Sequence, residues 1–74
     1  MQEKVNKSLS DYLKLIRFKK KKSQLDIAKI LGVSRNTYSI WENNPINLKL
    51  NTLIEISSAM EEDVLSYFNE LIKG

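Results

Sequence analysis

Apolar residues recur every three or four positions along most of the chain, which is the spacing of one face of an α-helix. Leu9, Leu13 and Ile16 predict a first helix over about residues 9–20, with Tyr12 on the same side. The same pattern predicts four more helices, over about residues 24–31, 35–43, 50–60 and 64–73. No stretch alternates as a half-buried strand does. The pattern therefore predicts a compact all-α domain of five helices.

Capping residues indicate where these helices begin. Ser8 or Ser10 can cap the first helix, which leaves residues 1–7 as a flexible arm before a folded domain. Ser23 starts the second helix, and Asp26 can complete a capping box with it. The buried face of this helix is expected to hold its apolar residues Ile27, Ala28, Ile30 and Leu31.

A very short turn joins the second and third helices. Gly32 can adopt the left-handed conformation that ends a helix, and Ser34 can cap the next one two residues later. This arrangement predicts a helix-turn-helix. On the third helix, Tyr38 and Trp41 are three positions apart, so they share a face and are expected to pack inward.

Composition excludes several classes of function. The 74 residues suffice for one domain, expected over residues 8–74. Cys and His are both absent, so the commonest metal ligands are missing and no metal or other cofactor is expected. The start is too polar for a signal peptide, and no apolar run approaches the roughly 20 residues of a membrane helix. We therefore expect a cytoplasmic protein without a membrane segment.

Charge is distributed unevenly, although the net charge is only +3. Residues 14–35 hold eight basic residues and one acidic residue, whereas residues 42–74 hold two basic and six acidic residues. One part of the molecule could thus face a polyanion. The run Lys19–Lys22 is interpreted as a solvated turn, with attraction to a nucleic-acid backbone as the alternative.

The stretch from residue 13 to residue 68 resembles the Cro and phage-repressor type of helix-turn-helix domain, often called the XRE family. The resemblance rests on Arg17, Gln24, the Ala28–Gly32 spacing, Val33-Ser34, Glu42, Leu53, Ile56 and Ala59-Met60. It implies a lambda-repressor-like fold whose third helix, residues 35–43, enters the major groove of operator DNA. We therefore expect a sequence-specific transcriptional regulator, in the first instance a repressor, and no enzyme.

The resemblance places base-reading side chains at Arg35, Asn36, Ser39 and Ile40. Arg35 suits guanine and Asn36 suits adenine, because each can form a bidentate pair with that base. Ser39 can donate or accept a hydrogen bond, and Ile40 can contact a thymine methyl group. The alternative for Arg35 and Asn36 is simple exposure to solvent.

Other polar residues are expected to position the protein on DNA or to stabilise its fold. The predicted phosphate contacts are Ser23, Gln24, Ser34 and Asn43. Helix N-termini offer free N–H groups to phosphate, although the two serines could serve as caps alone. The resemblance also implies a structural ion pair between Arg17 and Glu42.

The sequence departs from the usual family pattern at two turns. Lys21-Lys22 replaces the usual Gly-Leu, which makes the first turn more basic. Asn44 stands where Gly is usual, and Asn tolerates the left-handed region. The usual Pro before the fourth helix is displaced to Pro45, so residues 43–49 are read as a loop.

A homodimer on an inverted repeat is expected, because one short helix reads few base pairs. Its predicted surface is the C-terminal helix with Tyr67, Leu71 and Ile72, unless these residues cover the domain's own core. A second hypothesis is an interaction module of the same fold, such as an antitoxin, with a toxin or antirepressor as partner. An enzyme is disfavoured, because the acidic cluster Glu61–Asp63 is explained by the dipole of the next helix, which Asp63 caps.

Overall fold

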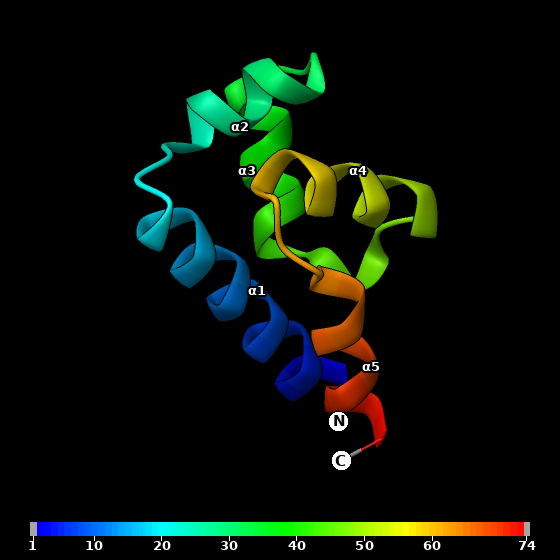
Figure 1. Cartoon of the computed structure of the whole chain (residues 1–74). Coiled ribbons are helices and arrows are strands. Elements are labelled where there is room, and N and C mark those ends of the chain that lie inside the picture. The colour runs from blue at the N-terminus through cyan, green and yellow to red at the C-terminus, as the bar shows by residue number, and fades with distance from the viewer. Residues whose placement is uncertain (1, 74) are drawn as a thin grey trace.

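The computed structural model describes residues 2–73 except the side chain of Ile72. Within this range the chain forms the five α-helices that the apolar periodicity predicts, and one short 3-10 helix. In chain order they are α1 (Gln2–Lys19), α2 (Gln24–Leu31), α3 (Arg35–Asn43), η1 (Pro45–Asn47), α4 (Leu50–Met60) and α5 (Val64–Lys73) (Figure 1). No strand occurs within residues 2–73, so the all-α prediction is confirmed.

The first helix is longer than predicted. α1 begins at Gln2, so the prediction of a flexible arm over residues 1–7 is wrong for all of the arm that the structure describes, which leaves out Met1. Neither Ser8 nor Ser10 caps it, because both lie inside the helix and Ser10 is buried. Glu3 in the first turn complements the helix dipole. Contacts of Asn6 with the end of α3 and with η1 give these turns tertiary support that the sequence pattern does not reveal.

The core forms where α1, α2, α3, α4 and α5 meet. Its fully or nearly buried residues are Leu9, Leu13, Ile16, Ile27, Ala28, Tyr38, Ile56, Met60 and Val64. One apolar prediction is wrong: Ile30 is 57% exposed, because α3 and α4 pack on the side of α2 that carries Ile27 and Ala28. Leu31 is half-buried against the core.

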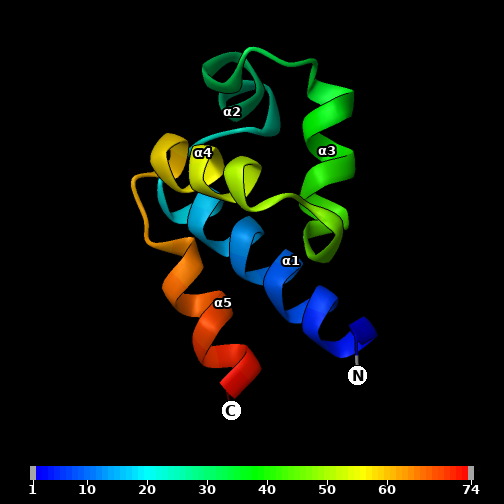
Figure 2. The same ribbon diagram turned by 90° about the vertical axis from the view of Figure 1, so that its right-hand side faces the viewer.

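The turn between α2 and α3 has the predicted geometry. Gly32 has a φ of +74°, in the left-handed region where a side chain would be strained. Its N–H and that of Val33 bond back to carbonyls of α2, and Ser34 then caps α3. Figure 2 shows α2 and α3 at the end of the molecule away from the last turn of α5. This turn therefore sets α3 at the far edge of the fold.

The exit from α3 differs from the sequence prediction. Asn44 has a φ of −134° and is not left-handed. Instead, its side-chain nitrogen donates to the carbonyl of Ile40 at 3.0 Å, which satisfies a helix-end carbonyl directly. Pro45 then starts η1 within the segment predicted as loop, and it is fully buried. The predicted cap of α5 is present, since Asp63 Oδ1 accepts from the N–H of Ser66 at 3.0 Å.

Candidate nucleic-acid interface

The outward side of α3 presents the predicted base-reading residues to solvent. Arg35 and Asn36 are exposed on its first turn, and Ser39 is half-buried. Ile40 is 57% exposed, although burial of an isoleucine side chain stabilises a protein. Ser34 begins this helix, so the exposed side chains lie next to free N–H groups. The four residues share one accessible helical surface.

The inward side of the same helix anchors it. Tyr38 is completely buried in the core, as predicted, and Trp41 is half-buried against the same cluster. Glu42 is also completely buried, which is unusual for a carboxylate and requires partners. The interior of α3 therefore depends on a polar network as well as on aromatic packing.

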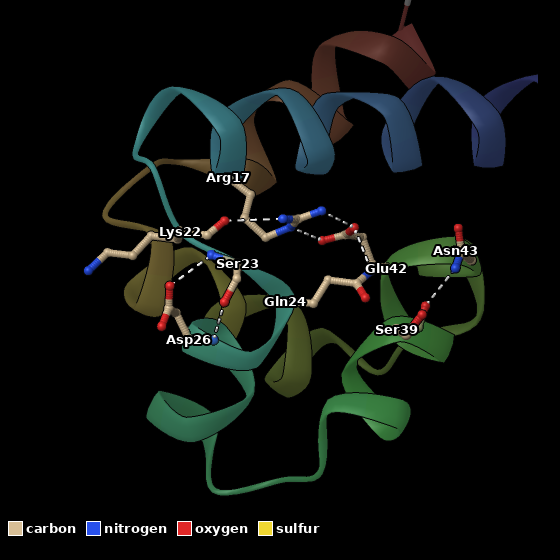
Figure 3. A network of polar contacts seen from close by, with 8 residues as sticks. All are labelled: Arg17, Lys22, Ser23, Gln24, Asp26, Ser39, Glu42 and Asn43. Atoms are coloured by element: carbon tan, nitrogen blue, oxygen red, sulfur yellow. Dashed lines mark hydrogen bonds and ion pairs between the residues drawn. The ribbon is translucent and has the colours of Figure 1, made fainter.

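Arg17 of α1 supplies the main partner. Its Nε lies 2.8 Å from Glu42 Oε2, and its Nη2 donates to Oε1 at 3.1 Å, which makes a two-pronged pair. Gln24 Nε2 of α2 donates to Oε1 at 3.1 Å. Figure 3 shows Arg17 and Gln24 converging on Glu42 from two other elements. The expected ion pair thus joins α1, α2 and α3 in one network.

This network explains the titration of its members. Burial would raise the pKa of Glu42, but the hydrogen bonds from Arg17 and Gln24 outweigh burial, so this pKa is lowered. The hydrogen bond to Glu42 also raises the pKa of Arg17. The hydroxyl of Tyr38 is buried without a hydrogen-bond partner among residues 2–73, so it does not donate to Glu42. We therefore ascribe the lowered pKa of Glu42 to Arg17 and Gln24. Burial and the Glu42 carboxylate raise the pKa of Tyr38.

The four predicted phosphate contacts all make bonds within the protein. Ser23 Oγ accepts from the Asp26 N–H at 3.0 Å and Ser34 Oγ accepts from the Thr37 N–H at 3.0 Å, so both serines are helix caps. The Asp26 carboxylate in turn accepts from the Ser23 N–H at 2.8 Å, which completes the predicted capping box. Both serine residues are exposed at the surface in this arrangement.

The amides of the other two phosphate candidates are oriented by the fold. Gln24 gives one of its two side-chain N–H groups to Glu42, so a second remains for another acceptor. Asn43 Nδ2 donates to the carbonyl of Ser39 at 2.9 Å, within α3 (Figure 3). Gln24 lies on α2 and Asn43 at the end of α3, so the candidates border α3 rather than form one cluster.

One residue of this region was missed by sequence reasoning. Asn6 of α1 donates from Nδ2 to the carbonyl of Asn43 at 3.1 Å, and its Oδ1 accepts from the Ile46 N–H at 3.1 Å. Asn6 thus bridges α1 to the exit of α3. Its polar side chain in a polar segment gives no periodic signal, and its partners are backbone groups 37 and 40 positions away.

Comparison with known proteins identifies the architecture. A family model described as helix-turn-helix matches residues 13–65, most of the chain. The chain belongs to the helix-turn-helix family. This result confirms the expected membership of the Cro and phage-repressor type. The match spans α2, the Gly32 turn, α3 and the Arg17–Glu42 pair, which are the features that define the site of this helix-turn-helix protein.

Two relatives of this helix-turn-helix protein carry the name antitoxin HipB. One is from Escherichia coli O6:H1 (strain CFT073) and one from Escherichia coli strain K12; each is 36% identical over 53 residues. The matches cover 72% of this chain but only 56% and 60% of the respective relatives. No solved structure matches the chain significantly. Within the part of the chain that is described, no helix is both long and apolar enough to cross a bilayer.

Proposed function

We propose that this protein is a sequence-specific regulator of transcription that places α3 in the major groove of operator DNA, with repression as its action. The observation that carries the proposal is the division of α3 into a buried side and an exposed side. The exposed side holds Arg35, Asn36 and Ile40, whose chemistry matches guanine, adenine and the thymine methyl group. An α-helix fits the major groove, where each base pair presents a distinct pattern.

We further propose that two copies bind an inverted repeat. One helix of nine residues reads only a few base pairs, and two-fold pairing places half-sites about 34 Å apart. The candidate surface lies along α1 and α5, where Tyr12 and Tyr67 stack with ring centroids 3.7 Å apart and Leu15 is 56% exposed. Leu71 is half-buried near the end of α5 and extends this surface; the side chain of Ile72, which was part of the prediction, lies outside the described residues.

Selection of bound duplexes from a random pool tests the DNA-reading proposal. The wild-type protein is expected to enrich a two-fold motif, and Arg35→Ala is expected to relax the preference at one position in each half-site. Each bidentate pair gives about 1–3 kcal/mol of discrimination, so the lost preference should be roughly 5- to 150-fold at that position. An equal loss of affinity for every sequence would contradict a base-reading role for Arg35.

Sedimentation tests the dimer. Leu15→Glu should shift the protein towards the monomer, because it adds a charge to an apolar surface that a second copy would cover. The matched control is Ile30→Glu on α2, an apolar side chain that is 57% exposed on a helix outside the proposed α1–α5 surface. A wild-type protein that stays monomeric on a two-fold duplex would contradict the dimer.

A second candidate function is that of an antitoxin, and the names of the two relatives favour it. It is compatible with DNA binding. A gel shift with upstream DNA and a pull-down with a toxin as prey separate the two roles. Retention of the toxin without any DNA shift would favour the interaction module over the regulator.

A further inference from the structure

The turn between α1 and α2 carries the densest positive charge of the described chain. Lys19, Lys20, Lys21 and Lys22 are consecutive and all exposed. Lys20 is engaged by the acidic turn before α5, since its Nζ lies 3.6 Å from Glu62 Oε1. None of the other three forms an ion pair within residues 2–73. Three cationic side chains therefore face solvent here.

The backbone at Lys21 is strained. Its φ is +57°, a left-handed conformation that costs a residue with a Cβ atom about 1–2 kcal/mol and costs glycine almost nothing. The N–H groups of Lys21 and Lys22 bond back to carbonyls of α1, so the turn has the geometry of a glycine helix stop. A lysine at this position therefore lowers stability relative to glycine.

The turn is fixed relative to α3. Arg17 Nη1 donates to the carbonyl of Lys22 at 3.1 Å, while the same guanidinium holds Glu42 of α3. Ser23 then caps α2 directly after the lysines. Figure 3 shows Lys22 at one edge of the polar network and Asn43 at the opposite edge, with Glu42 between them. The cationic turn is thus held next to the N-terminus of α2, where Gln24 lies, and is linked to α3 through Arg17.

We propose that Lys21 and Lys22 bind the phosphodiester backbone of the duplex beside the base pairs that α3 reads, as an anchor that is independent of sequence. This inference rests on the proposed function. DNA carries closely spaced negative charges, and each lysine that neutralises a phosphate releases a counterion. The anchor adds affinity for all duplexes equally, whereas Arg35 and Asn36 choose among them.

Lys21→Gly is the sharpest test, because it should change stability and binding in opposite senses. Relief of about 1 kcal/mol of backbone strain should raise Tm by about 4–8 °C. Loss of one phosphate contact in each copy should weaken binding to every duplex by roughly 5-fold per copy at low salt and reduce the slope of log K against log salt by about 1 per copy, or about 2 for the dimer. Base preference should stay unchanged. Lys22→Gln should lower the slope likewise without the rise in Tm.

Two controls separate charge from backbone relief. Glu61 is the only other non-glycine residue with a positive φ among residues 2–73, so Glu61→Gly relaxes the same strain without removing a positive charge. It should raise Tm and leave DNA affinity undiminished. Lys73→Ala removes an exposed positive charge from the last turn of α5 and should leave the salt slope unchanged.

The outcomes distinguish this inference from the function on which it rests. If the wild-type protein selects a motif but Lys21→Gly and Lys22→Gln keep the wild-type salt slope, the anchor is wrong and the regulator stands. If the wild-type protein binds all duplexes alike with a slope that these variants reduce, the anchor is supported and sequence reading is contradicted.

Discussion

The two sides of α3 differ in how their polar groups are satisfied. On the inward side, the buried Glu42 accepts hydrogen bonds from Arg17 and Gln24, and Tyr38 fills the core. On the outward side, Arg35 forms no ion pair within residues 2–73, and Ile40 stays more than half exposed. The inward side thus stabilises the fold, whereas the outward side adds little to it and carries the residues for which we propose base reading.

The largest loss of stability is expected when Glu42, on the inward side of α3, is replaced. Glu42→Ala leaves the Arg17 guanidinium without its partner in a half-buried site, which typically costs about 3–5 kcal/mol. We expect a loss of about 3 kcal/mol, measured by thermal or denaturant unfolding. The matched control is Glu55→Ala on α4, an exposed position where the change should stay within about 0.5 kcal/mol. Equal melting temperatures for the two variants would contradict a stabilising role for the network.

The outward side should show the converse behaviour. Asn36→Ala removes an exposed amide and should change the free energy of unfolding by less than about 0.5 kcal/mol. In a binding assay it should cost about 1–3 kcal/mol of discrimination at one adenine. Circular dichroism melting and competition with base-substituted duplexes measure the two quantities. A large drop in stability with unchanged base preference would show that Asn36 stabilises the fold and does not read a base.

A smaller effect is expected where α1 holds the exit of α3. Asn6→Ala removes two hydrogen bonds, to the carbonyl of Asn43 and from the N–H of Ile46, and should cost about 1–2 kcal/mol of stability. Lys7→Ala on the same helix breaks only an exposed pair with Asp11 and should cost less than about 0.5 kcal/mol. If both variants unfold alike, the bridge from Asn6 contributes nothing measurable.

The smallest effect concerns acid. Because the pKa of Glu42 is lowered in the folded protein, its contribution is complete above the ordinary value of about 4.3 and is lost as pH falls through the folded pKa. Hydrogen bonds with Ser23 and Ser66 lower the pKa of Asp26 and of Asp63, so acid also weakens these caps. Glu42→Gln should therefore flatten, without abolishing, the loss of stability between about pH 5 and pH 2. An unchanged acid profile would show that Glu42 does not titrate on unfolding.

Residues whose role is local or periodic were predictable from the sequence. Gly32, Ser34 and Asp63 act through neighbours two to four positions away, and the inward side of α3 follows from the spacing of Tyr38 and its neighbours. The Arg17–Glu42 pair spans elements, and only the family resemblance indicated it. The base-reading and phosphate roles remain predictions, because they concern contacts with a second molecule that packing within the chain does not determine.

The errors lie where distant backbone groups decide the local structure. The segment over residues 2–7 has no strong apolar period, yet Asn6 fixes it through backbone groups of Asn43, the last residue of α3, and of Ile46 in η1. The strain at Lys21 has no periodic signal either, and its one indication in the sequence was that lysine stands where the family usually has glycine. Ile30 fits the apolar period of α2, but the fold leaves no element to cover it.

The bridge from Asn6 has a practical consequence for anyone who handles this molecule. The side-chain amide of Asn6 links the first turns of α1 to the backbone at the end of α3 by two hydrogen bonds. A bulky affinity tag fused close to α1, or a trimmed version that starts at residue 8, would loosen the C-terminal end of α3 without touching any residue on its outer surface. Binding constants measured on such versions would understate the affinity of the intact helix.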